Sequence, residues 1–148
     1  MSRETPSSEE SERARRAVEA LYSRDSASQA LGMRLEAVGP GWARVVMTVR
    51  ADMVNGHGLC HGGVVFALAD SAFAFACNSH DESTVAAAAS IDYLQPARAG
   101  ESLTAEAREL WRTRRNGLYE VVIANERGER VALMRGRSYC LGGRVSGG

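Results

Sequence analysis

The chain has 148 residues, of which 45% are hydrophobic and 24% charged, a composition typical of one globular domain. Eighteen basic residues balance eighteen acidic ones, which argues against nucleic acid or an acidic membrane surface as the main partner. The three cysteines, Cys60, Cys77 and Cys140, contain no Cys-x-x-Cys pair, so neither a disulfide framework nor a structural zinc site is expected. Together with a polar N-terminus and the lack of any membrane-length apolar run, these features predict a cytoplasmic protein.

The first part of the chain predicts helix. Residues 1–10 are polar and are expected to form a frayed tail. Apolar residues recur at helical spacing over Ser11–Arg24, which predicts an amphipathic helix, and a short helical turn at Ser28–Leu31 is expected to end at Gly32. We therefore assign residues 1–26 to an N-terminal tail and helix, and residues 27–148 to the main domain.

Two strands, a loop and a long helix are expected next. Met33–Val38 and Trp42–Val49 have strand character and flank the turn sequence Gly39-Pro40-Gly41. Asp52–His61 is polar and rich in glycine, as expected of a loop. The segment Gly62–Cys77 is apolar nearly all round, which predicts a helix that is covered on every side.

The rest of the chain predicts four more strands. They are Val85–Leu94, Ser102–Trp111, Leu118–Ala124 and Val131–Tyr139. Asn116-Gly117 is expected to be the hairpin turn before the third of them, and the glycine-rich residues 142–148 are expected to be loose. One apolar helix with a mostly antiparallel sheet predicts an α+β fold, in which a curved sheet covers one side of the helix and a second copy of the chain could cover another.

Asp70 is the one ionisable residue of the apolar helix. It lies in the middle of that helix, so it cannot act as a cap for free N–H groups at the helix start. A carboxylate among apolar side chains is costly to bury unless it is paired or lines a cleft, and reactive carboxylates occupy such sites. The alternative is a structural buried acid bonded to the backbone or to an arginine.

The start of the same helix, Gly62-Gly63, offers N–H groups that have no helical partner. Such groups can receive an oxyanion or a thioester carbonyl, although a plain flexible turn would have the same sequence. Eight residues separate Gly62 from Asp70, so they lie about 12 Å apart along the helix axis. If both act on one carbonyl, they must belong to different subunits, which predicts a dimer with two equal sites.

Four stretches carry a resemblance to a known family. They are NGHGLCHGG at 55–63, LAD at 68–70 and ACNS at 76–79, followed by SIDYLQP at 90–96. They resemble the HotDog-fold thioesterases of phenylacetic acid degradation (the PaaI group), over about residues 27–143. The resemblance implies a curved antiparallel sheet wrapped around one long central helix, hydrolysis of acyl-CoA thioesters without a cofactor, aryl-acyl substrates of the phenylacetyl-CoA type, and a dimer of dimers.

The resemblance also implies roles for single residues. Asp70 would be the nucleophile or the general base, and the Gly62 N–H would polarise the thioester carbonyl. Asn55 would orient the carbonyl or the attacking water, while His61 would support catalysis and Gly63 substrate binding. Thioester hydrolysis needs such an acid and such donors, but the sequence does not decide between an anhydride intermediate and attack by a water that Asp70 activates.

Other polar residues have less specific interpretations. Arg112, Arg114, Arg115 and Arg137 could bind CoA phosphates or could form an ordinary charged surface. No metal site is expected, because His57 and His61 lie in a glycine-rich loop without an acidic third ligand. Cys60 is expected to pack in the core rather than react.

Two other classes of function remain open. A HotDog dehydratase would act on hydroxyacyl thioesters and would need a reactive histidine paired with an acid, for which His61 is the candidate. A non-catalytic acyl-CoA-binding module would bind without turnover and would not need an acid in the apolar helix. Release of free thiol without an enoyl product distinguishes the thioesterase from both.

Overall fold

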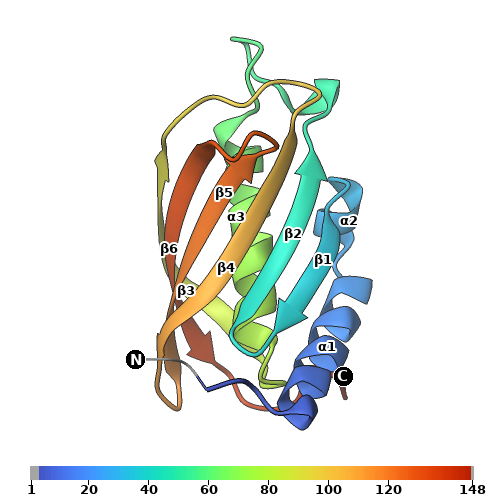
Figure 1. The fold of residues 1–148 in the computed structure, drawn as a ribbon, viewed down its shortest axis with the longest axis vertical. Coiled ribbons are helices and arrows are strands. Elements are labelled where there is room, and N and C mark those ends of the chain that lie inside the picture. The colour runs from blue at the N-terminus through green and yellow to red at the C-terminus, as the bar shows by residue number, and fades with distance from the viewer. Residues whose placement is uncertain (1–3, 148) are drawn as a thin grey trace.

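The fold is a single curved sheet with one helix in its hollow. The structure, a computed structural model, describes residues 4–147. Six strands pair antiparallel in the order β1-β2-β4-β5-β6-β3 (Figure 1). The strands are β1 (Arg34–Gly39), β2 (Trp42–Thr48), β3 (Thr84–Tyr93), β4 (Ser102–Arg112), β5 (Asn116–Asn125) and β6 (Arg130–Cys140). The predicted strands agree with these within two residues at each end.

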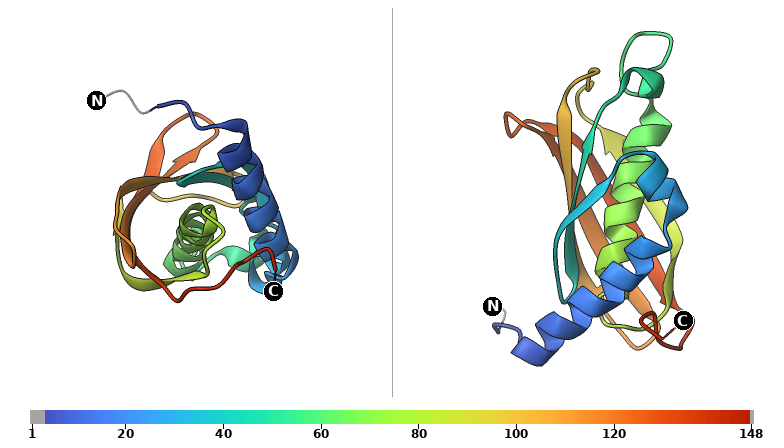
Figure 2. Two further views of the ribbon diagram at one scale, coloured as in Figure 1. Left: turned by 90° about the horizontal axis from the view of Figure 1, so that it is seen from below. Right: turned by 90° about the vertical axis from the view of Figure 1, so that its right-hand side faces the viewer.

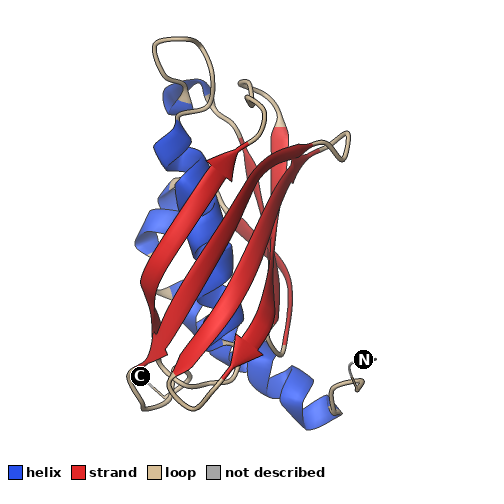
Figure 3. Ribbon diagram, turned by 90° about the vertical axis from the view of Figure 1, so that its left-hand side faces the viewer, coloured by secondary structure: helices blue, strands red, loops and turns tan. Residues whose placement is uncertain are grey.

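The central helix α3 (Gly62–Asn78) runs along the concave face of the sheet. Figure 2 shows the sheet curling around this helix, and Figure 3 shows the strands with the helices behind them. Leu68, Phe73 and Phe75 are fully buried in one apolar core with Val45 of β2 and Val121 of β5. The predicted α+β architecture, with a curved antiparallel sheet around one long central helix, is confirmed.

The N-terminal helix begins earlier than predicted. Helix α1 (Ser8–Ser23) starts inside the stretch 1–10 that was expected to be a tail, of which residues 1–3 lie outside the described part of the chain. The Ser7 side chain caps the helix by accepting the Glu10 N–H at 3.1 Å. A serine followed three residues later by glutamate is a helix-start signal, which explains the earlier start. A short helix α2 (Ser26–Ala30) follows, as predicted.

The Asn116-Gly117 pair is not the hairpin turn, so that prediction was wrong. The turn is residues 113–115, and Asn116 already belongs to β5, where Gly117 pairs with Arg112 of β4. A Cβ on Gly117 would lie 2.8 Å from both Ser138 and Tyr119. The glycine is therefore needed for close packing within the sheet rather than for a turn conformation.

The C-terminal segment is docked rather than loose as expected. Val145 is buried, and the Asp81 carboxylate accepts the Val145 and Ser146 N–H groups at 3.1 and 2.8 Å. Arg24 donates to the Val145 carbonyl at 3.1 Å. These contacts tie the end of the chain to α1 and to the end of α3; Gly148 lies outside the described residues.

Strand β3 is an exposed edge of the sheet. It pairs with β6 on one side, and residues 85–90 are exposed to solvent. Four of these residues are consecutive alanines, Ala86–Ala89, so the edge carries little side-chain bulk. Within residues 4–147 no helix is long and apolar enough to cross a membrane.

Candidate active site

The loop before α3 fixes the orientation of the Asn55 amide. Its Oδ1 accepts the backbone N–H groups of His57 and Leu59 at 2.9 and 3.2 Å. Because these groups can only donate, the atom facing them must be the oxygen. The Nδ2 group has no hydrogen-bond acceptor within residues 4–147, so it is available as a donor to a ligand.

One backbone N–H at the start of α3 is also available. His61 caps the helix, with its Nδ1 accepting the Gly63 N–H at 2.9 Å. The His61 N–H donates to the Met53 backbone carbonyl, and the Val64 N–H donates to the His61 backbone carbonyl. Among the described residues, the Gly62 N–H has no acceptor, as expected for a donor in the first turn of a helix. The sequence singled out both glycines, and the structure leaves Gly62 as the free donor.

A cavity of about 310 Å³ lies beside this donor. Its lining is mostly apolar and comes from the loop, the first turn of α3, the end of β3 and the chain that follows it. It is lined by Asn55, Leu59, Cys60, Gly62, Val65, Tyr93, Leu94, Gln95, Pro96, Ala97 and Val131. An apolar cavity with a few polar donors is the usual form of a small-molecule site.

Asp70 lies on the partly exposed face of α3. Its carboxylate makes no hydrogen bond or ion pair within residues 4–147. Burial, and then the negative charge of Asp25, raise the pKa of Asp70 above its ordinary value. Within the described residues, therefore, neither an arginine nor a backbone group holds the carboxylate, as the structural alternative would require. A partly buried carboxylate without a partner is suited to act as a base or a nucleophile.

A polar chain that the sequence analysis missed runs beside Asp70. Asp25 caps α2 by accepting the Ser28 N–H at 2.9 Å and the Ser28 hydroxyl at 2.6 Å. The Ser28 and Ser71 hydroxyls are 2.7 Å apart, which links α2 to the residue that follows Asp70. The only signal in the sequence was the Asp25-x-x-Ser28 spacing of a helix cap, which does not reveal its tertiary partner.

Asp70 and the Gly62 donor do not share one centre within a chain. Both lie on the straight helix α3, about 12 Å apart along its axis by the helical rise. Asp70 is also absent from the lining of the cavity beside Gly62. The structure thus brings Asn55, His61 and Gly62 together and leaves Asp70 on the same helix two turns away.

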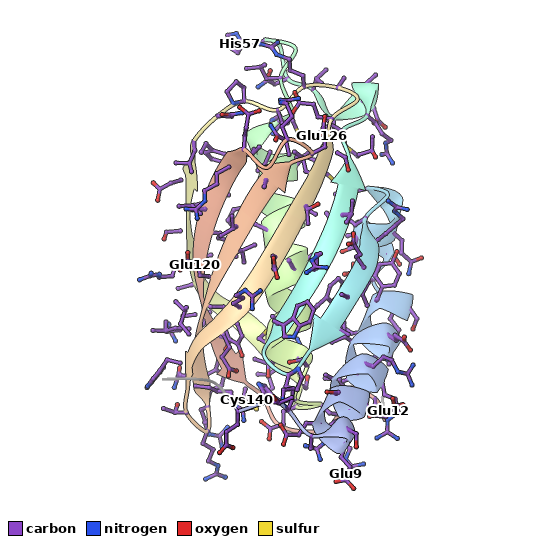
Figure 4. The ribbon with its side chains drawn as sticks, viewed as in Figure 1. Glu9, Glu12, His57, Glu120, Glu126 and Cys140 are labelled. Carbon is purple, nitrogen blue, oxygen red and sulfur yellow. The ribbon has the colours of Figure 1, made fainter. Side chains whose placement is uncertain are left out.

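The arginines predicted to bind CoA phosphates lie near the end of the molecule opposite to the loop that carries Asn55 and His57. Figure 4 shows His57 at one end and Cys140 at the other. Arg112, Arg114 and Arg115 line a cavity of about 470 Å³ at the tip of the β4–β5 hairpin. Arg137 lies on β6 and is not part of that lining. Its guanidinium donates to the Asn116 side-chain oxygen on β5 at 3.2 Å. The structure therefore groups three of the four arginines.

The thiols near the site are buried. Cys60 is 7% exposed, and burial raises the pKa of its thiol above the ordinary value. Burial also raises the pKa of the Cys77 thiol to about 12. A buried thiol with a raised pKa is a poor nucleophile, so both cysteines serve as core residues.

The fold and the site together define a class of protein. A HotDog sheet around a helix whose first turn presents a free N–H to an apolar cavity can bind a carbonyl and stabilise charge on its oxygen. The chain also provides a partly buried carboxylate without a partner. These features are those of an enzyme that hydrolyses acyl compounds.

Comparison with known proteins gives the family. The model of the thioesterase superfamily matches residues 57–132. Acyl-coenzyme A thioesterase PaaI of Escherichia coli is 45% identical over 128 residues, which cover 86% of this chain and 91% of the relative. The chain therefore belongs to the thioesterase superfamily and is a thioester hydrolase.

Solved structures agree with this assignment. The structure of the E. coli PaaI protein superposes with a TM-score of 0.89 at 44% identity, covering 90% of this chain and 97% of that one. A mutant of the phenylacetic acid degradation protein PaaI from Thermus thermophilus superposes with a TM-score of 0.76 at 41% identity, covering 79% and 100%.

Proposed function

We propose that this enzyme hydrolyses aryl-acyl-CoA thioesters of the phenylacetyl-CoA or hydroxyphenylacetyl-CoA type to the free acid and CoA. The observation that carries the proposal is the free Gly62 N–H beside the Asn55 amide at a mostly apolar cavity. The similarity to an acyl-CoA thioesterase adds the substrate class. The three cysteines are free, which fits a reducing compartment such as the cytoplasm.

In the proposed reaction, the Gly62 N–H and the Asn55 Nδ2 donate to the thioester oxygen. Asp70 either attacks the carbonyl carbon or removes a proton from the attacking water. Charge builds up on the oxygen as the new C–O bond forms, and the two donors stabilise it. If Asp70 is the base, the C–S bond then breaks and the leaving thiolate takes up the proton that Asp70 removed from the water. If Asp70 is the nucleophile, the thiolate leaves behind an acyl–Asp70 anhydride; water then hydrolyses it to the free acid, a proton from that water goes to the thiolate, and the Asp70 carboxylate is restored. These steps use residues of the protein alone and require no metal or cofactor.

The reacting groups are proposed to come from two chains. Within one chain Gly62 and Asp70 are too far apart to act on one carbonyl. The exposed edge strand β3 and the partly exposed α3 residues Phe66, Ala67, Asp70 and Ala74 support a dimer. An unpaired strand edge favours pairing with another chain. A two-fold axis would bring Asp70 of each chain to the Gly62 end of the other, and two such dimers would form the proposed dimer of dimers.

The arginines at the β4–β5 hairpin are proposed to bind the CoA phosphates. Arg112, Arg114 and Arg115 surround a cavity large enough for a phosphate group. Guanidinium groups bind phosphates through paired N–H donors. Arg137 is proposed to contribute from β6. The dehydratase alternative gains no support from the structure, since the His61 Nδ1 is already used to cap α3.

A thiol-release screen over aryl and straight-chain acyl-CoAs tests the substrate proposal. We expect phenylacetyl-CoA and its hydroxylated forms to have a kcat/KM at least about tenfold above straight-chain substrates of similar size, because a mostly apolar cavity discriminates by shape. A preference for straight chains would contradict the aryl assignment. Binding of every substrate without thiol release would instead favour the acyl-CoA-binding module.

A further inference from the structure

A second basic cavity lies beyond the end of α3, beside α1 and the C-terminal segment. Its volume is about 500 Å³, and three of its lining residues are arginines: Arg13 and Arg16 of α1, and Arg144. Glu82 and Gly143 line both this cavity and the one at the β4–β5 hairpin, so the two cavities adjoin. Figure 1 shows the C-terminus beside α1 at this end of the molecule. The proposed function uses other arginines and leaves this cavity without a role.

The guanidinium groups of the three arginines are free to bind a ligand. They form no hydrogen bond or ion pair within residues 4–147. By contrast, Arg15 on the same helix is paired with Glu12 and Glu19 and does not line the cavity. Like charges one turn apart on a helix repel each other, so the Arg13 and Arg16 pair is unfavourable until an anion compensates it. The cluster therefore has the charge of an anion-binding site.

The C-terminal segment holds Arg144 at this cavity. The next residue, Val145, is buried, and the Asp81 carboxylate accepts the N–H groups of Val145 and Ser146 at 3.1 and 2.8 Å. From the other side, Arg24 donates to the Val145 carbonyl at 3.1 Å. The backbone beside Arg144 is thus fixed without a ligand, and a site that is already ordered loses less entropy when a ligand binds.

Two acids line the same cavity and reduce its positive charge without cancelling it. The Asp81 carboxylate is already occupied, since it accepts two N–H groups and the Ser146 hydroxyl of the C-terminal segment. Glu82 is exposed to solvent, and three guanidinium groups outnumber the two carboxylates. Guanidinium groups bind phosphates through paired N–H donors, and a phosphate monoester offers them three acceptor oxygens. The chemistry of the cavity therefore indicates a phosphate monoester as its ligand.

The position of the cavity fits the length of CoA. Asp70 and Asn78, the last residue of α3, lie about 12 Å apart along the helix axis. About thirteen bonds link the sulfur of CoA to its first phosphorus, and such a chain spans up to about 15 Å when extended. A thioester whose carbonyl lies at Asp70 can therefore place its nucleotide at the end of α3 of the same chain.

We propose that Arg13, Arg16 and Arg144 bind the 3′-phosphate of CoA, beside the hairpin arginines that bind its diphosphate. The inference rests on the proposed function, which supplies CoA as the ligand. CoA carries a diphosphate and a separate phosphate monoester on its ribose, and these two groups match two adjoining basic cavities. The consequence is that the enzyme prefers CoA thioesters to thioesters on a phosphopantetheine arm, which lacks the ribose phosphate.

Phenylacetyl-CoA and phenylacetyl-3′-dephospho-CoA, compared as substrates, test the site. For the wild type we expect kcat/KM to be about tenfold lower without the 3′-phosphate, through KM, because the lost bonds are charge-assisted and distant from the carbonyl. The double variant Arg16→Gln, Arg144→Gln should lose about tenfold on phenylacetyl-CoA and stay within about twofold of the wild type on the dephospho substrate. Arg15→Gln is the control and should keep the wild-type preference. A wild type without preference, or an equal loss of the double variant on both substrates, would overturn the proposal.

Calorimetric titration with CoA and 3′-dephospho-CoA separates this proposal from the proposed function, because binding does not require turnover. At 0.15 M salt, which screens non-specific attraction, we expect the double variant to raise the Kd of CoA about tenfold and to leave that of 3′-dephospho-CoA unchanged. Equal Kd values for the two ligands in a wild type that releases thiol would overturn only the 3′-phosphate site. The expected preference in a protein that releases no thiol would overturn only the proposed function.

Discussion

Asp70→Asn is expected to reduce kcat for thiol release by about a thousandfold, the size of effect found when a general base or a nucleophile is removed. Asparagine has nearly the same shape but can neither accept a proton from water nor attack the carbonyl. Steady-state thiol release on phenylacetyl-CoA measures the effect. Activity within about tenfold of the wild type would contradict a chemical role for Asp70.

Asp70→Asn is also expected to stabilise the fold, which would exclude misfolding as the cause of the lost activity. Burial and the charge of Asp25 raise the pKa of Asp70, so the folded chain holds this proton more tightly than the unfolded chain does. Above the raised pKa the ionised carboxylate opposes folding, and Asp70→Asn should therefore raise Tm at pH 7. As the pH falls through the raised pKa toward the ordinary value, Asp70 becomes protonated and the advantage should disappear. A lower Tm at pH 7 would contradict this account.

Asn55→Asp is expected to lower kcat by about a hundredfold, the range found for the loss of one oxyanion donor. A carboxylate can still accept the His57 and Leu59 N–H groups, so the loop keeps both of its hydrogen bonds. The Nδ2 donor, however, is replaced by an oxygen that repels the developing charge.

Measuring kcat together with thermal melting distinguishes the loss of the Asn55 Nδ2 donor from any damage to the loop. A large loss of kcat with an unchanged Tm is the expected result. Retention of activity would show that Asn55 acts through its oxygen, as a residue that holds the loop or the water, and would contradict its role as a donor to the carbonyl.

The helix and its acid could be predicted from the sequence because both depend on local pattern. An apolar run with one carboxylate has few structural solutions, and α3 indeed spans Gly62–Asn78 with Asp70 in its middle. The strands were also predictable, since alternation along β4 and β5 follows directly from a half-buried sheet. The rise per residue of an α-helix was then enough to predict that Gly62 and Asp70 of one chain lie too far apart to act on one carbonyl.

The rest depends on contacts between distant parts of the chain. The sequence could not show that His61 takes up the Gly63 N–H and leaves Gly62 free, because the two glycines look alike until the ring is placed. The hydrogen bond from the Tyr93 hydroxyl to the Gly62 carbonyl joins β3 to α3 and has no local signature. Gly117 looked like a turn residue because the crowding by Ser138 comes from a different strand.

Each site is proposed to combine Asp70 of one chain with Asn55 and Gly62 of another. Mixed dimers of Asp70→Asn and Asn55→Asp chains, purified through a different tag on each chain, test it most directly. Each mixed dimer would hold one intact site and one doubly altered site, so activity should recover to about half of the wild type. Mixed dimers no more active than either variant alone would contradict the shared site.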